Sequence, residues 1–135
     1  MRQQHVLVLD DNEAILAVVK EALIYEDFQV NDIPDAVHFF EAVRDFRPDL
    51  ILLDYHLSGV NGGDLCRQIK AMEQYRHIPV IIFSAYFSKG DPPIGVDCDG
   101  FLHKPFDLTE LLEVISQHTQ AARPGVGIIV PKDLL

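Results

Sequence analysis

Short runs of apolar residues alternate with longer stretches of helical periodicity along this chain, and this alternation limits the fold more than any other feature. The central run, Leu50–Leu53, is apolar at every position, as expected of a strand that is buried on both faces of a sheet. Repeated strand–helix units imply parallel strands that are joined by right-handed crossovers. The pattern therefore predicts an α/β fold with a doubly wound, five-stranded parallel sheet.

The apolar pattern also indicates where the elements begin and end. Strands are expected at residues 5–9, 28–33, 50–53, 78–83 and 101–102. The first helix has Asp11 or Asn12 as its N-cap, and the second is expected to open at Pro34 and Asp35. Proline and glycine interrupt the segment between the fourth and fifth strands, so a short or distorted fourth helix is expected there.

Composition narrows the classes of protein to which the chain can belong. With 135 residues, of which 48% are apolar, it suits one globular domain, expected over residues 1–121 with a linker or tail over residues 122–135. The formal net charge of −10 repels nucleic acid and anionic lipid, so direct nucleic-acid binding is not expected. No run approaches the roughly 18 apolar residues of a membrane span. Two cysteines without metal-type spacing favour reduced thiols and a cytoplasmic location.

Polar residues stand at the end of four of the predicted strands. Asp10 and Asp11 follow the first strand, Asp54 follows the third, Ser84 ends the fourth and Lys104 follows the fifth. Because the carboxyl ends of parallel strands meet at one edge of a sheet, these side chains are expected to lie together, where ligands of such sheets bind.

Three carboxylates within a few ångströms repel one another, so at least one pKa should rise unless a cation is present. A hard divalent ion with oxygen ligands relieves that repulsion, and Mg²⁺ is the natural candidate. The absence of histidine and cysteine from the cluster argues against zinc. Mg²⁺ with a lysine and a hydroxyl can hold phosphoryl oxygens, and a neighbouring carboxylate can act as the nucleophile.

The sequence resembles the receiver domains of two-component response regulators. The resemblance rests on Asp10-Asp11, on Asp54 within LLDYHLSGVNG, on Ser84-Ala85, and on Lys104-Pro105 within GFLHKPF, in this order and at similar separations. It covers about residues 3–121 and implies the flavodoxin-like (β/α)5 receiver fold. Each element alone is common, and the ordered set is specific.

The resemblance implies a role for each matching residue. Asp54 corresponds to the phosphoacceptor, Lys104 and Ser84 to the groups that bind the phosphoryl oxygens, and Ser84 with Phe101 to the switch pair. The further implied roles are the Ala85 backbone at the phosphoryl group, a cis bond before Pro105, and Mg²⁺ ligands from Asp11, Asp54 and the backbone carbonyl of His56. Asp10 would bind the Mg²⁺ directly or hold a metal-bound water.

The implied activity is transfer of a phosphoryl group from a sensor histidine kinase or a histidine phosphotransfer protein to Asp54, followed by slow self-catalysed hydrolysis. A single-domain regulator and the receiver of a longer parent chain with a covalently linked output domain both fit the sequence, and the linker-like tail favours the second. The bulky side chains of His56 and Tyr86 are expected to slow that hydrolysis by limiting water access.

Two other functions remain open from the sequence. A receiver-like domain that never takes phosphate could serve as an interaction module, although a pure scaffold does not require the acid–lysine set. A Mg²⁺-dependent phosphatase with an aspartyl nucleophile would usually carry a second aspartate two residues further on, where this chain has His56. Turnover of a phosphate ester would distinguish the phosphatase from the receiver.

Overall fold

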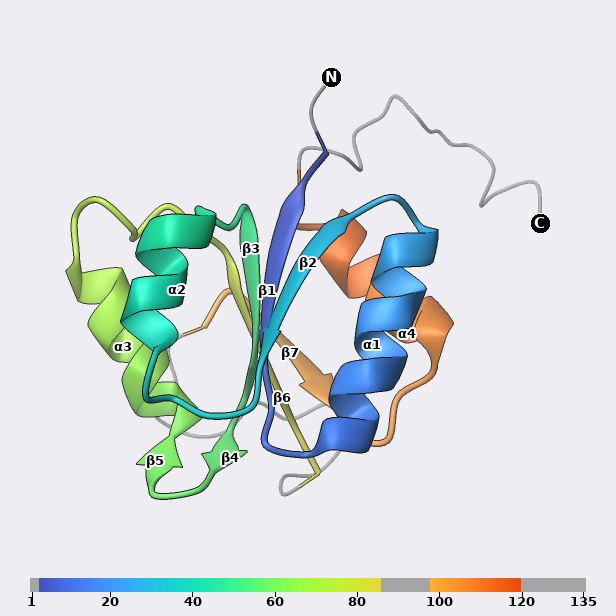
Figure 1. Cartoon of the computed structure of the whole chain (residues 1–135), viewed down its shortest axis with the longest axis horizontal. Helices are drawn as coiled ribbons and strands as arrows, with labels where there is room; N and C mark the ends of the chain where they lie inside the picture. Colours follow the sequence, from blue (N-terminus) through green and yellow to red (C-terminus); the bar gives the residue numbers. More distant parts are fainter. Residues whose placement is uncertain (1–2, 86–97, 120–135) are drawn as a thin grey trace.

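The computed structural model describes residues 3–85 and 98–119, in which a parallel sheet lies between two layers of helices (Figure 1). The sheet has five strands in the order β2-β1-β3-β6-β7. Their bounds are His5–Leu9 for β1, Gln29–Ile33 for β2, Leu50–Asp54 for β3, Val80–Ser84 for β6 and Gly100–His103 for β7. The predicted doubly wound, five-stranded parallel sheet is confirmed.

Helices cover both faces of this sheet, with α1 and α4 on one face and α2 and α3 on the other (Figure 1). Alternate residues of β1 contribute to the two layers, because side chains of a strand point to opposite faces. Leu7 and Leu9 belong to the core beneath α2 and α3, whereas Val6 and Val8 belong to the core beneath α1 and α4. The helix bounds are Glu13–Tyr25 for α1, Phe39–Phe46 for α2, Gly62–Ala71 for α3 and Leu108–Ser116 for α4.

The first turn of α2 lies later in the sequence than predicted. The helix was expected to open at Pro34 and Asp35, and it begins at Phe39. The carboxylate of Asp35 accepts a hydrogen bond from the backbone N–H of Val37 at 3.0 Å. Short acidic side chains favour such local turns over helix, because they offer the backbone an alternative partner.

The strands also differ in detail from the prediction. The fourth strand was expected from Ile78 and begins at Val80, directly after Pro79, which has no N–H for the ladder. A small antiparallel hairpin, formed by β4 (His56–Leu57) and β5 (Val60–Asn61), follows β3 where only a loop was expected. This hairpin lies beside the carboxyl edge of the sheet.

Several expectations fall on residues that are not described. The distorted fourth helix would lie mainly within residues 86–97, and the boundary near residue 121 and the tail lie within residues 120–135. Both therefore lie outside the described residues. Within residues 3–85 and 98–119, no helix has the length and apolar character needed to cross a bilayer.

Candidate functional site

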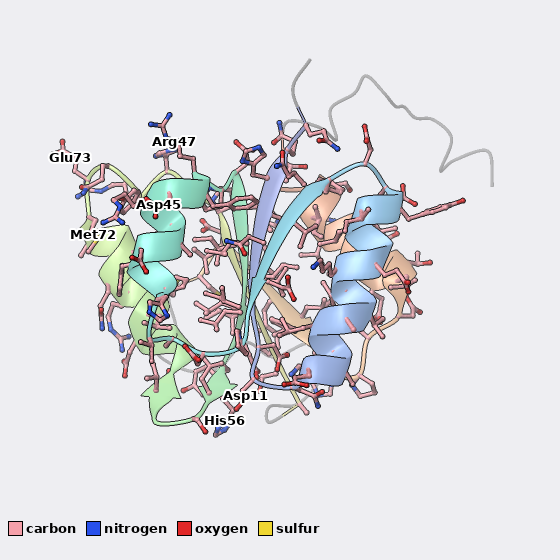
Figure 2. All side chains as sticks on the ribbon, in the orientation of Figure 1. Asp11, Asp45, Arg47, His56, Met72 and Glu73 are labelled. Atoms are coloured by element: carbon pink, nitrogen blue, oxygen red, sulfur yellow. The ribbon has the colours of Figure 1, made fainter. Side chains whose placement is uncertain are left out.

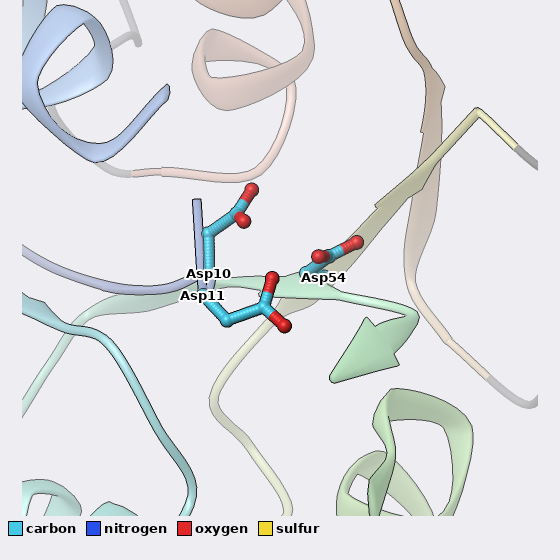
Figure 3. Close-up of side chains that lie close together, drawn as sticks. All are labelled: Asp10, Asp11 and Asp54. Atoms are coloured by element: carbon cyan, nitrogen blue, oxygen red, sulfur yellow. The ribbon is translucent and has the colours of Figure 1, made fainter. Parts of the chain in front are cut away.

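The three aspartates of the predicted cluster meet at the carboxyl edge of the sheet (Figure 3). Each of Asp10, Asp11 and Asp54 has a carboxylate oxygen within 4.8 Å of the others. Asp10 is fully buried and Asp54 is 4% exposed, whereas Asp11 is exposed. The parallel topology thus brings together residues that are far apart in the sequence.

The N-cap of α1 determines how the adjacent side chains of Asp10 and Asp11 are oriented. Asn12 is the N-cap of α1, and its side-chain oxygen accepts hydrogen bonds from the N–H groups of Ala14 at 2.9 Å and Ile15 at 3.2 Å. The N–H of Asn12 in turn donates to Oδ1 of Asp10 at 2.8 Å. Because Asn12 serves as the cap, the carboxylate of Asp11 remains directed toward the cluster (Figure 3).

Lys104 provides the positive charge of the site. Its Nζ donates to Oδ2 of Asp10 at 2.9 Å and lies 3.4 Å from Oδ1 of Asp54. The lysine side chain is only 15% exposed, so water screens these contacts weakly. Its bond to Pro105 is cis.

The surroundings of the Asp54 carboxyl raise its pKa and so disfavour its ionised form. Burial, and next the charge of Asp10, raise its pKa to about 6, although Lys104 and the N–H of His56 act in the opposite direction. One lysine therefore does not compensate the buried acid pair. A strained set of oxygen donors fits a hard divalent cation.

A cavity of about 220 Å³ opens above Asp54 and is lined by Asp54, His56, Ser84, Ala85 and Lys104. The structure thus brings the predicted Ser84, Ala85 and Lys104 to the phosphoacceptor candidate. Ser84 is 1% exposed, and its carbonyl accepts the N–H of Lys104 at 2.9 Å, which fixes the lysine backbone beside β6.

The structure gives the positions of Phe101 and His56 but does not test the roles predicted for them. Phe101 is half-buried in β7 and packs against the core beneath α2 and α3. The ring of His56 contacts the ring of Tyr55 edge-on at 5.6 Å between centroids. The backbone N–H of His56 donates a hydrogen bond to the Asp54 carboxylate. The expected metal role of the His56 carbonyl and the switch role of Phe101 remain predictions.

Gly62 is required by a close approach of two backbone segments. A Cβ at this position would lie 2.1 Å from the carbonyl oxygen of Asp54. The N–H of Gly62 donates to the Tyr55 carbonyl at 2.7 Å, and Asn61 caps α3 by accepting the N–H of Gly63 at 2.7 Å. The start of α3 thereby packs closely against the backbone of Asp54 and Tyr55.

Sequence reasoning did not single out Phe83. Its ring lies under the Lys104 ammonium, with Nζ 4.9 Å from the ring centroid. In the sequence Phe83 is one more apolar residue of a buried strand, so nothing in the pattern separates it from a core residue.

The chain is similar to a family of known proteins over most of its length. The family model for the response regulator receiver domain matches residues 6–116. The chain belongs to this family, and it is a receiver domain of the response-regulator type.

Relatives support the same assignment. The DNA-binding response regulator MtrA of Mycobacterium tuberculosis is 34% identical over 112 residues, which are 82% of this chain and 48% of that protein. The transcriptional regulatory protein CseB of Streptomyces coelicolor is 36% identical over 107 residues, covering 78% of this chain and 44% of that protein. The chain thus spans about half the length of these curated relatives.

Solved structures show the same fold. The receiver domain of the sensor histidine kinase PA1611 from Pseudomonas aeruginosa, with a magnesium ion coordinated in its active site cleft, has a TM-score of 0.77 and 26% identity, covering 87% of this chain and 98% of that chain. The chemotaxis protein CheY4 of Vibrio cholerae, at 23% identity, has a TM-score of 0.79 and covers 87% of this chain and 99% of that chain.

Proposed function

We propose that this receiver domain accepts a phosphoryl group on Asp54 in a Mg²⁺-dependent reaction. The observation that carries the proposal is the arrangement of one buried, strained carboxylate with a lysine 3.4 Å away and two further aspartates beside it. A scaffold gains no stability from such an arrangement, because buried like charges oppose folding. Phosphoryl transfer uses each of these groups.

The donor in this proposal is a phosphohistidine of a sensor histidine kinase or of a histidine phosphotransfer protein. A carboxylate oxygen of Asp54 forms the new P–O bond, the P–N bond of the donor breaks, and the imidazole leaves with the electron pair of that bond. Lys104 neutralises charge on a phosphoryl oxygen, while the Ser84 hydroxyl and the Ala85 N–H donate to others. The cavity above Asp54 provides the space for this group.

Asp10, Asp11 and Asp54, together with the backbone carbonyl of His56, are the proposed Mg²⁺ ligands. All are oxygen donors of the kind that Mg²⁺ prefers. The bound ion would supply positive charge for the transferring phosphoryl oxygens. The magnesium ion in the cleft of the related PA1611 receiver supports this choice of metal.

Phosphorylation is proposed to act through Ser84 and Phe101. A phosphoryl group would draw the Ser84 hydroxyl inward, and the Phe101 ring would fill the vacated space, biasing the surface near β7 between two states. We further propose a cytoplasmic location and an output domain in the same parent chain, which agrees with relatives about twice as long. The net charge of −10 supports a receiver that leaves nucleic-acid binding to such a domain.

Intact-protein mass spectrometry after incubation with acetyl phosphate and Mg²⁺ tests the proposal. We expect a gain of one phosphoryl group that is lost with chelator and in Asp54→Asn. Asp45→Asn is the matched control, because Asp45 is an exposed aspartate at the opposite end of the molecule from Asp11 and His56 (Figure 2). Loss of labelling in both variants, or labelling that survives in Asp54→Asn, would contradict the assignment of the acceptor.

No uptake of phosphate by the wild-type protein, from acetyl phosphate or from a phosphohistidine donor, would instead favour an interaction module that works without phosphorylation. Continuous release of phosphate from an ester substrate would favour the phosphatase. The three functions therefore give three different results in the same assay series.

A further inference from the structure

We propose that Phe83 is a positioning residue that holds the Lys104 ammonium in the site through the face of its aromatic ring. The proposal rests on the function proposed above. The ammonium Nζ lies over the ring, 4.9 Å from its centroid, which is within the range of a cation–π contact. Phe83 is 2% exposed and the Lys104 side chain is 15% exposed, so the contact is largely shielded from water.

The backbone of β6 positions the Phe83 ring beside Asp54 and beneath the Lys104 ammonium. In the register of β3 and β6, Phe83 is the partner of Asp54, and the next residue, Ser84, accepts the backbone N–H of Lys104 at 2.9 Å. On its other side the ring meets the ring of Phe106 at 5.8 Å between centroids with a tilt of 60°. The ring is therefore fixed beneath the lysine by the strand and by a second aromatic residue.

The ring differs from the other two partners of Lys104 in one respect. Those partners, Asp10 at 2.9 Å and Asp54 at 3.4 Å, both belong to the acidic cluster that would hold a cation. A cation that shares their charge weakens their attraction for the ammonium. The quadrupole of Phe83 is not shared in this way, so its attraction for Lys104 persists.

A cation–π contact also imposes little direction on the ammonium. A hydrogen bond weakens steeply when its angle is lost, whereas attraction to a ring face tolerates small lateral shifts of the charge. During phosphoryl transfer the lysine must move from Oδ1 of Asp54 to a phosphoryl oxygen. With Phe83 beneath it, Lys104 can make this shift without leaving the site.

The alternative is that Phe83 serves only to pack the core. It belongs to the core beneath α1 and α4. A leucine would then serve equally well. Phe83→Leu keeps an apolar side chain and removes the π face, so it separates the two roles. Phe39→Leu is the matched control, because Phe39 is a fully buried aromatic residue in the opposite layer.

The first readout is the side-chain NMR resonance of Lys104 in protein without metal or phosphate. Protons near an ammonium that lies over a ring are shifted upfield by the ring current. We expect the Hε resonances of Lys104 to lie upfield of those of Lys20, which pairs with Asp32 on the surface. The displacement should vanish in Phe83→Leu and persist in Phe39→Leu.

The second readout is the initial rate of phosphorylation by acetyl phosphate. We expect Phe83→Leu to lower the rate about 5- to 30-fold, which corresponds to about 1–2 kcal/mol for a shielded cation–π contact. In a Lys104→Gln background the same substitution should change the residual rate by less than about twofold, since no cation remains. Phe83→Met, whose longer and more flexible side chain adapts better to the space left by the ring, replaces Phe83→Leu if the latter does not fold.

An equal loss of rate in both backgrounds, or an equal loss with Phe39→Leu, would show that Phe83 acts only through packing. An unchanged Lys104 resonance in Phe83→Leu would overturn the positioning role directly. A wild-type protein that takes up no phosphoryl group would instead overturn the proposed function, while the resonance still reports the contact. The two failures are thereby distinguished.

Discussion

Removing the charge of Asp54 should stabilise the metal-free protein. The pKa of this carboxyl is raised to about 6 from 3.8, first by burial and then by the charge of Asp10. Each pKa unit corresponds to about 1.4 kcal/mol, so the ionised group costs the native state up to about 3 kcal/mol. Asp54→Asn replaces the carboxylate by a neutral group of similar size and should recover about 1–3 kcal/mol, a figure that already includes the attraction of Lys104 for the carboxylate.

The sign of the pH dependence follows from the raised pKa of Asp54. Both folded and unfolded forms hold the proton below the unfolded value of 3.8, so wild type and Asp54→Asn should there be nearly equal in stability. As pH rises, the unfolded state releases its proton first, and wild type loses stability until the folded group also ionises near pH 6. The gap between the two proteins should therefore open between these values and stay constant above them.

Urea unfolding in the presence of chelator, from about pH 4 to about pH 8, measures this gap. Asp45→Asn is the control of opposite sign, because the hydrogen bond from Arg44 lowers the pKa of Asp45. That substitution should leave stability unchanged or reduce it at neutral pH. An Asp54→Asn protein no more stable than wild type above pH 6, or a gap that does not narrow toward pH 4, would refute the reasoning.

Three further predictions concern the same site. Excess Mg²⁺ should raise the thermal midpoint of wild type, with about 2.7 kcal/mol of stabilisation at a hundredfold excess over Kd, and calorimetry should find this effect strongly reduced in Asp11→Asn. Gly62→Ala should lower the urea midpoint and slow phosphorylation, since its Cβ would meet the Asp54 carbonyl at 2.1 Å; a normal rate would contradict this. His56→Ser should shorten the phosphoryl half-life measured by mass spectrometry, and an unchanged half-life would remove His56 from control of water access.

The sequence was sufficient to predict the assembly of the site, and there is a physical reason for this. The apolar run of β3 indicates a buried parallel strand, and the carboxyl ends of parallel strands lie at the same edge of the sheet. A polar residue directly after such a run can therefore be assigned to this edge of the sheet from the strand pattern alone. This is why Asp10, Asp54, Ser84 and Lys104 were brought together correctly from residues distant in the chain.

The pairings inside the site could not be predicted in the same way. Asp10 and Asp11 are adjacent in sequence, yet one is fully buried and the other exposed, because the chain turns from β1 into α1 between them. That turn depends on Asn12, and the sequence left the cap open between Asn12 and Asp11. The contact of Lys104 with the ring of Phe83 depends on the register of β6, which periodicity does not determine.

The raised pKa of Asp54 also means that its ionised form reduces the stability of the folded protein. A domain of this size is typically stable by about 5–15 kcal/mol, so a strained Asp54 costs a substantial share of the total. Packing on both faces of β3 stabilises the fold and offsets this cost, because all five residues of the strand are buried. A bound cation or a new bond at Asp54 would relieve the strain. Under the proposed function, the energy that burial adds to this carboxylate would bias the protein toward the cation-bound and phosphorylated states.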